Sequence, residues 1–161
     1  MSVKSSVFRP VEAADRVDYP KLERAIQQWW DDNSVLKLYL QRNEQSEKRY
    51  SFLDGPMTAN NPMGVHHAWG RTYKDLYQRF KTMQGFKQRY QNGFDCQGLW
   101  VEVEVEKQLG LQNKQEIEAF GIAKFVELCK ERVVTFAKRI TSQSIRLGQW
   151  ADWGNDYYTF S

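Results

Sequence analysis

Apolar residues recur every three or four positions along much of this chain, a period that predicts amphipathic helices. The first such stretch begins near Pro20, since proline fits the first turn of a helix, and runs to about Asn33. Ile26, Trp29 and Trp30 lie on its apolar side, and we expect the two tryptophans to pack in the core rather than contact a ligand.

The clearest apolar stripe in the first half of the chain predicts a helix that follows Gly64 and stops at Gly85. Its apolar positions are Val65, Trp69, Tyr73, Leu76, Phe80 and Met83. The other side of this helix carries charged residues, which include Arg71, Lys74, Arg79 and Lys81. We expect these four cations to face solvent.

A short strand is predicted at residues 50–53, before the helix, and a second strand leads into Gly93–Gly98 after it. The polar residues 42–49 indicate a surface loop or a hairpin tip. A strand, a helix and a second strand in this order predict a parallel pair joined by a right-handed crossover. The expected fold class is therefore α/β, with a Rossmann-like parallel βαβ core and an N-terminal helical lead-in.

Residues 100–106 alternate Val and Glu, which by period alone would predict a strand. We favour a helix, because Val105 and Leu109 are four apart and Gly110 is a typical helix stop. A short helix from Asn113 to Gly121 and a long helix from there to Gly148 complete the pattern.

These elements suggest three parts: a helical lead-in at 1–49, the first half of a nucleotide-binding catalytic domain at 50–148, and the start of a further segment at 149–161. The last part contains a turn and several aromatic residues. We expect it to have nothing to pack against in this chain, which would suggest truncation.

Composition narrows the class of protein only moderately. The chain has 161 residues, 41% of them hydrophobic, and a net charge of +3, which is too mild to indicate nucleic-acid binding by itself. Cys96 and Cys129 lack the spacing of a zinc site or a disulfide framework, and we expect reduced thiols in a cytoplasmic protein. No signal peptide or membrane-spanning run is evident.

Candidate chemistry lies where a turn rich in Gly, Pro and Asn, residues 54–64, precedes the helix that begins at Val65. Backbone N–H groups at a helix start are unpaired and carry the positive end of the helix dipole, so phosphates bind there. His66 and His67 would add directional donors. The segment therefore predicts a nucleotide site, although a histidine pair at a helix start can also be a simple cap.

The same segment resembles the first signature of class I aminoacyl-tRNA synthetases, which reads Pro-x-x-x-Asn-Gly, then His-Ile-Gly-His-Ala, then Lys-Asp. Pro56, Asn60, His67-Ala68 and Lys74-Asp75 fall on matching positions. Residues 93–102, Gly-Phe-Asp-Cys-Gln-Gly-Leu-Trp-Val-Glu, are similar to the Gly-Trp-Asp-x-His-Gly-Leu-Pro-x-Glu segment of the isoleucyl members. Leucyl and valyl members differ around Asp95.

The resemblance implies ATP-dependent activation of isoleucine and its transfer to tRNA(Ile), with Mg²⁺ arriving together with ATP. His66 and His67 are the implied catalytic residues, and they would bind ATP together with Asn60 and Gly64. The implied amino-acid-binding residues are Pro56, which would line the side-chain pocket, Asp95, which would pair with the ammonium group, and Gln97, which stands where relatives have histidine. Asp95 could instead be an ordinary turn residue, and Gln97 could have an indirect role or none.

The signature departs from its usual form, because Gly64-Val65-His66-His67 stands in place of His-x-Gly-His. The first and third positions have exchanged residues. Either the His66 ring turns aside or the floor under adenine is reshaped. We expect ATP to bind still and adenylate-mimicking inhibitors to lose affinity.

The Lys-Met-Ser-Lys-Ser loop, the editing insertion and the anticodon-binding region of the family are not found in this sequence. We therefore expect an N-terminal part of a longer enzyme that is inactive alone. The alternatives are a valyl- or leucyl-specific synthetase and a non-catalytic paralogue that binds a nucleotide, tRNA or a protein partner. For the cations on the helix after Gly64, contact with tRNA is the alternative to solvent exposure.

Overall fold

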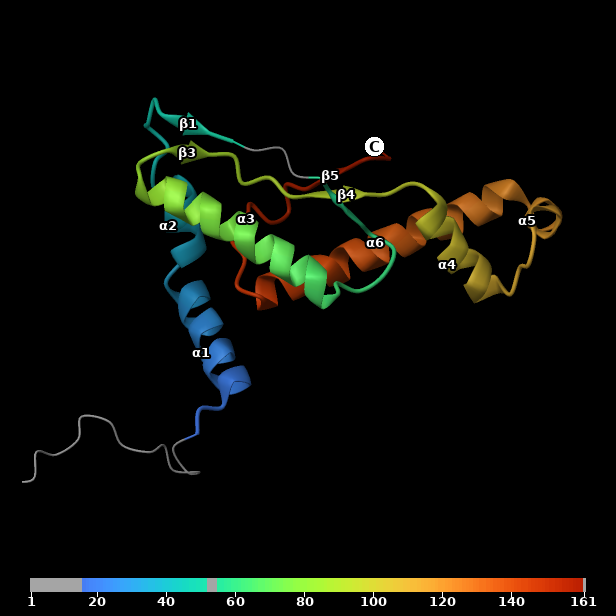
Figure 1. The fold of residues 1–161 in the computed structure, drawn as a ribbon, viewed down its shortest axis with the longest axis horizontal. Helices are drawn as coiled ribbons and strands as arrows, with labels where there is room; N and C mark the ends of the chain where they lie inside the picture. The colour runs from blue at the N-terminus through green and yellow to red at the C-terminus, as the bar shows by residue number, and fades with distance from the viewer. Residues whose placement is uncertain (1–15, 52–54, 161) are drawn as a thin grey trace, which may run out of the picture. The chain divides into compact units, whose positions relative to one another are not determined.

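The computed structural model describes residues 16–51 and 55–160. It divides into two compact units, Met1–Val35 and Leu36–Ser161 (Figure 1). The predicted strand at 50–53 and the predicted turn at 54–64 both extend into residues 52–54, which lie outside the described residues.

The first unit contains α1 (Tyr19–Asp32), as the apolar spacing predicted. The carboxylate of Asp18 caps its start by accepting from Lys21 N–H at 3.1 Å. The prediction that Trp29 and Trp30 pack in a core is wrong: Trp29 is 58% exposed and Trp30 is only half-buried. The unit that holds α1 is too short to enclose a core of its own.

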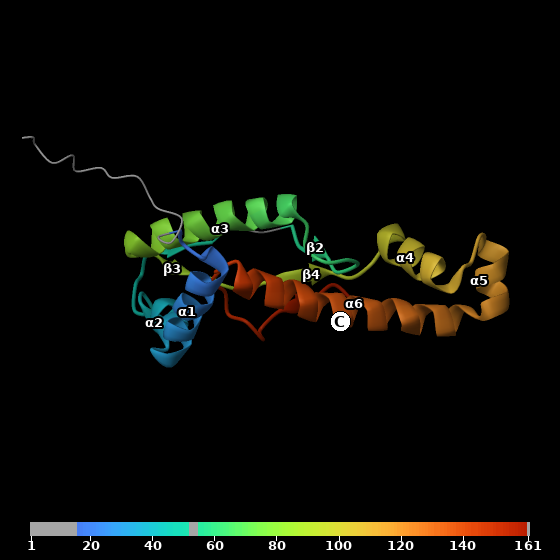
Figure 2. The same cartoon turned by 90° about the horizontal axis from the view of Figure 1, so that it is seen from below.

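In the second unit, the strands of the described residues are short and each pair is parallel, which confirms the α/β class. The strand beside residues 93–95 lies at 57–58, within the segment predicted to be a turn, and not at 50–53. The pairs are β1 (Arg49–Tyr50) with β3 (Lys87–Gln88), β2 (Met57–Thr58) with β4 (Gly93–Asp95), and β4 with β5 (Tyr157–Tyr158). The strands run between α3 (Val65–Met83) and α6 (Ile122–Arg146), as Figure 2 shows.

The orientation of α3 differs from our prediction, although its bounds agree with it. Arg71 is buried, and Arg79 is half-buried with its guanidinium 3.7 Å from the ring centre of Trp150. By contrast, the apolar stripe faces outward, with Val65 88% and Met83 74% exposed. The expectation that the cations face solvent is therefore wrong for these two arginines, because the polar side of α3 finds partners in the unit.

For residues 100–106, the alternation of Val and Glu favoured a strand, whereas the spacing of Val105 and Leu109 favoured a helix. Leu99–Leu109 forms α4, which confirms the helical interpretation of residues 100–106. Val101 and Val105 are buried, and Gly110 ends the helix in the left-handed region at φ +74°. One further helix, α2 (Val35–Gln41), was not predicted.

The two remaining helices lie where the sequence predicted them. The Asn113 side chain accepts from Glu116 N–H at 3.0 Å and caps α5 (Lys114–Phe120). Helix α6 follows directly after Gly121 and packs against both α4 and α5. Its buried residues join the strands in one core, composed of Ala59, Phe94, Cys96, Val101, Val133, Ala137 and Ile140.

The expectation that residues 149–161 have nothing to pack against is wrong. Strand β5 extends the sheet beside β4, in register Phe94 with Tyr158, and the two rings lie 5.5 Å apart (Figure 1). Aromatic residues near the C-terminal end of the chain thus help to cover the core. Residues 36–49, which we grouped with the lead-in, belong to the same compact unit as the sheet.

Candidate functional site

A pocket of about 790 Å³ lies at the start of α3, within the second unit. Its wall is formed by residues 55–58, which lead into and include β2, by the loop after β2, by the first three turns of α3 and by one residue of α4. Its lining residues are Gly55, Pro56, Met57, Thr58, Asn60, Asn61, Pro62, Gly64, His66, His67, Gly70, Arg71, Lys74 and Trp100. Among the residues that the structure describes, the lining contains cations, imidazoles and amides but no carboxylate, which suits an anionic ligand.

The loop that enters the pocket is fixed to the sheet and to α4. The buried Ala59 donates its backbone N–H to Asp95 O at 2.9 Å, which continues the β2–β4 pairing by one residue. The Asn60 side chain donates to Trp100 O at 3.4 Å. These contacts place Asn60 at the rim of the pocket, where its amide can reach a bound molecule.

His67 both caps the helix and faces the pocket. Its Nδ1 accepts the backbone N–H of Gly64 at 3.1 Å. In a neutral imidazole whose Nδ1 accepts, the proton is on Nε2, which is then a donor. Burial lowers the pKa of His67, and the charges of His66 and Arg71 lower it further. His67 can therefore serve as a cap and a neutral donor at the same time.

The His66 ring turns back over Gly64. A Cβ atom at residue 64 would lie 3.0 Å from Cε1 and 3.2 Å from Nδ1 of His66, so the absence of a side chain there makes room for the imidazole. The ring also lies 3.9 Å from the ring of His67, between centres. The His66 side chain remains among the residues that line the pocket.

Asp95 lies next to the pocket but is not among its lining residues. It ends β4 and is half-buried; its Oδ2 accepts from the Thr58 hydroxyl at 2.9 Å. Gln97 is exposed, and its amide donates to Thr159 O at 2.6 Å. The structure thus gathers Pro56, Asn60, Gly64, His66 and His67 in one pocket, places Asp95 beside it through Thr58, and leaves Gln97 outside.

Arg71 is the main site residue that sequence reasoning misplaced. It is 4% exposed, and its Nη1 donates to Asn92 Oδ1 at 3.1 Å and to Gln149 Oε1 at 3.0 Å. A buried guanidinium in the pocket wall raises the local positive potential. The available signal was its position four residues after His67, which puts both on one side of a helix.

Thr58 and Trp100 are pocket residues that we did not single out. Trp100 is 68% exposed and stands where the resembling family segment has proline, and that departure was the available signal. For Thr58 the signal was its place two residues after Pro56, on the same face of a strand.

The described residues 16–51 and 55–160 contain no group of three or more His, Cys, Asp or Glu side chains arranged to hold a metal ion. Among those residues, no helix is long and apolar enough to cross a membrane.

Comparison with known sequences identifies the family of the chain. The family model of class I tRNA synthetases for isoleucine, leucine, methionine and valine ("tRNA synthetases class I (I, L, M and V)") matches residues 25–161. The chain belongs to this family of class I aminoacyl-tRNA synthetases.

Individual relatives point to one branch of that family. The chain is 40% identical to an isoleucine–tRNA ligase of Thermobifida fusca over 144 residues, which cover 89% of this chain and 14% of the relative. It is 42% identical to an isoleucine–tRNA ligase of Streptomyces coelicolor over 94% of this chain and 14% of the relative. The chain is 41% identical to an isoleucine–tRNA ligase 2 of Bacillus cereus over 85% of this chain and 13% of the relative. The chain thus spans about 14% of the length of these relatives.

Proposed function

We propose that this chain is the ATP- and amino-acid-binding part of an isoleucine–tRNA ligase. In the proposed reaction, a carboxylate oxygen of isoleucine attacks the α-phosphorus of ATP, pyrophosphate leaves, and isoleucyl-adenylate forms. A ribose hydroxyl at the end of tRNA(Ile) then attacks the acyl carbon, and AMP leaves. The chain alone is proposed to be inactive, since it covers a small share of its relatives' length.

One observation carries this proposal: His66 and His67 in the first turn of α3 and the buried Arg71 in its second turn all line one pocket. No protein nucleophile is required for adenylate formation. Donors aimed at charge that grows on the phosphate oxygens accelerate such a step, as does correct orientation of the two substrates. His66 and His67 are proposed as the catalytic residues, and Asn60 and Gly64 as further ATP-binding residues.

The amino acid is proposed to bind beside the triphosphate. Its ammonium group would pair with the Asp95 carboxylate, whose Oδ2 is oriented by Thr58. Pro56 lines the pocket near that point and would contact the aliphatic side chain. The Gln97 side chain is bonded to Thr159 O, so its proposed contribution to amino-acid binding is indirect.

Mg²⁺ is proposed to enter as the complex with ATP. The lining residues that the structure describes include no carboxylate, so the phosphate oxygens of ATP would hold the ion. In that complex the ion would neutralise phosphate charge and make pyrophosphate a better leaving group.

The domain division is also proposed, with a lead-in at 1–49, the first half of the catalytic domain at 50–148 and the start of a further segment at 149–161.

The free cysteines Cys96 and Cys129 support a cytoplasmic location. The isoleucyl assignment rests on the resemblance of residues 93–102 and on the relatives named above.

An amino-acid panel in ATP–pyrophosphate exchange, run on the complete polypeptide that contains this chain, tests the proposal. Isoleucine should support the fastest exchange. Faster exchange with valine or leucine would assign a different specificity, and no exchange with any amino acid would favour a non-catalytic paralogue. A single methylene distinguishes isoleucine from valine by roughly 200-fold at most, so valine should give a slow but measurable signal.

A further inference from the structure

Helix α6 reaches back to the loop that borders the pocket. We call residues 59–64 the nucleotide loop. Arg132 Nε donates to Asn60 O at 2.9 Å, and Arg132 Nη2 donates to Asn61 Oδ1 at 2.9 Å. One guanidinium therefore binds two successive residues of the loop, from a position more than 70 residues further along the chain.

Arg132 is itself held in place from several sides. Its Nη2 lies 3.4 Å from Glu104 Oε2, an ion pair with α4, and its guanidinium lies 4.6 Å from the ring centre of Phe136. The Arg132 side chain is 15% exposed. A guanidinium fixed by an ion pair, a ring and two loop contacts has little freedom to follow a displaced loop.

Gln143, three turns further along α6, holds the other end of the loop. Its Oε1 accepts the backbone N–H of Met63 at 2.8 Å, one residue before the cap of α3. At the opposite end, Ala59 N–H is bonded to the sheet through Asp95 O. The nucleotide loop is thus fixed at both ends and in its middle, and α6 supplies the attachments at Asn60, Asn61 and Met63.

The geometry points to Arg132 as a positioning residue for ATP binding, with Gln143 in support: α6 sets the position of the nucleotide loop without contacting the substrate. This inference rests on the proposed function for its consequence in catalysis. The planar guanidinium donates in two directions at fixed angles, which the single ammonium of lysine cannot reproduce. A displacement of about 1 Å at a reacting centre can cost roughly 100-fold in rate, so a loosened loop should affect ATP strongly.

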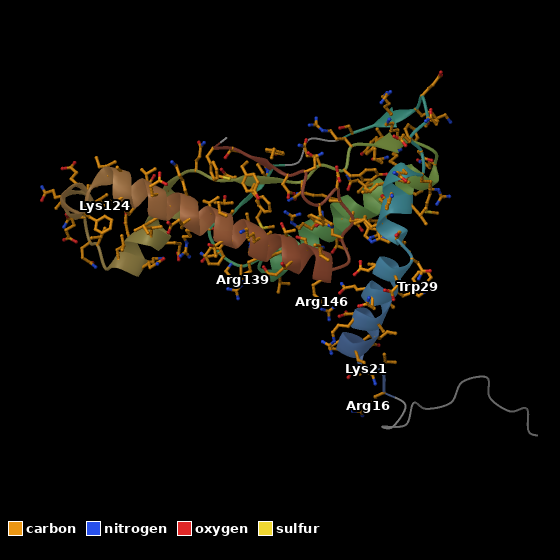
Figure 3. The ribbon with its side chains drawn as sticks, turned by 180° about the vertical axis from the view of Figure 1, so that it is seen from behind. Arg16, Lys21, Trp29, Lys124, Arg139 and Arg146 are labelled. Carbon is orange, nitrogen blue, oxygen red and sulfur yellow. The ribbon has the colours of Figure 1, made fainter. Side chains whose placement is uncertain are left out.

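The test uses Arg132→Gln, Arg132→Lys and Gln143→Leu in the complete polypeptide. Arg139→Gln is the matched control, since Arg139 lies on the same helix with an exposed side chain (Figure 3). Two readouts are needed: amide hydrogen exchange of residues 59–64, and the KM values for ATP and for isoleucine in pyrophosphate exchange. Far-UV circular dichroism and the Tm of each variant report whether it folds.

Arg132→Gln should raise amide exchange in the nucleotide loop and raise the KM for ATP by about tenfold, while the KM for isoleucine stays within about twofold. Arg132→Lys should fall between Arg132→Gln and the unmodified protein, and Gln143→Leu should raise exchange at Met63 in particular. The control should match the unmodified protein. If Arg132→Gln does not fold, Arg132→Lys and Gln143→Leu still decide the question.

Folded variants with unchanged exchange in residues 59–64, or equal rises in the KM for ATP and isoleucine, would overturn the inference. The proposed function fails separately, if the unmodified polypeptide supports no amino-acid-dependent exchange. Amide hydrogen exchange of residues 59–64 does not depend on activity. In that case, this measurement by itself would decide whether Arg132 positions the nucleotide loop.

Discussion

Thr58 and Asp95 face each other across the parallel pair of β2 and β4, and the Thr58 hydroxyl donates to Asp95 Oδ2 at 2.9 Å. Residues in register on neighbouring strands extend from the same side of the sheet. The hydroxyl therefore orients the carboxylate that is proposed to receive the substrate ammonium.

Replacement of Thr58 by valine should weaken isoleucine binding. Valine keeps the shape of threonine and removes the donor, and a hydrogen bond to a charged group contributes about 1.5–3 kcal/mol. We expect the KM for isoleucine to rise about tenfold or more in pyrophosphate exchange, with the KM for ATP little changed. Thr58→Ser is the control that keeps the hydroxyl, and it should stay near the unmodified value. Equal behaviour of the Val and Ser variants would contradict this role.

The pKa of His67 should be measurably low. Burial and the charges of His66 and Arg71 lower it from the ordinary value of 6.5, so the folded protein favours the neutral ring. The resulting contribution to stability is fully present above the unfolded pKa and is lost as the pH falls through the folded pKa. Protonation would also remove the Nδ1 acceptor that caps Gly64.

A titration of the imidazole proton resonances by NMR checks this prediction, with His66→Asn to assign the signals. The chain has two histidines, so one variant is sufficient for assignment. The midpoint for His67 should lie below that of the urea-unfolded chain. A midpoint at or above the unfolded value would mean that His67 is not held as a neutral cap.

Asp75 should stabilise the fold rather than bind a substrate. Its Oδ2 accepts from Arg79 Nε at 2.5 Å, and its Oδ1 accepts from Trp150 N–H at 3.1 Å, so it joins α3 to the segment after α6. We expect Asp75→Asn to lower the free energy of unfolding by about 1–3 kcal/mol, because its half-buried partners Arg79 and Trp150 lose a charged acceptor. Urea denaturation of the chain measures this.

Glu127→Gln is the control for that experiment. The Glu127–Lys130 pair spans 2.7 Å with both side chains more than half exposed, and such pairs contribute little. An Asp75 variant no less stable than the Glu127 variant would contradict the structural role. This role also accounts for the Lys-Asp part of the signature without assigning Asp75 to the chemistry.

The exchanged signature gives a prediction about inhibitors. Because the His66 ring lies over Gly64, Gly64→His alone should be crowded, whereas Gly64→His with His66→Gly restores the usual order. The double variant should keep a KM for ATP within a few-fold of the unmodified protein and bind adenylate-mimicking inhibitors more tightly. Inhibition constants from pyrophosphate exchange measure the change, and an unchanged sensitivity would defeat the idea.

Local signals predicted most of the helices. Gly110 and Asn113 marked a stop and a start correctly, and the spacing of Val105 and Leu109 correctly outweighed the strand-like alternation of residues 100–106. Five candidate residues, Pro56, Asn60, Gly64, His66 and His67, lie in one pocket because they come from a short segment at one turn and one helix start. Thr58, Arg71 and Trp100 of the same pocket were missed or misplaced.

The face on which each helix or strand packs could not be predicted from the sequence. The partners of Arg71 are Asn92 and Gln149, 21 and 78 residues away, and no period within α3 contains that information. The same holds for β5, whose pairing with Phe94 joins distant parts of the chain. Hydrophobic spacing says which residues share a face, and the tertiary partners decide which face is covered.

The most direct test of the central claim is an ATP titration of the isotopically labelled chain, followed by backbone amide NMR. If the start of α3 binds the triphosphate, the largest shifts should fall on residues 60–67, and His67→Ala should weaken them. Saturable binding with shifts centred there is the predicted result. Shifts centred elsewhere, or no binding at millimolar ATP, would contradict the account.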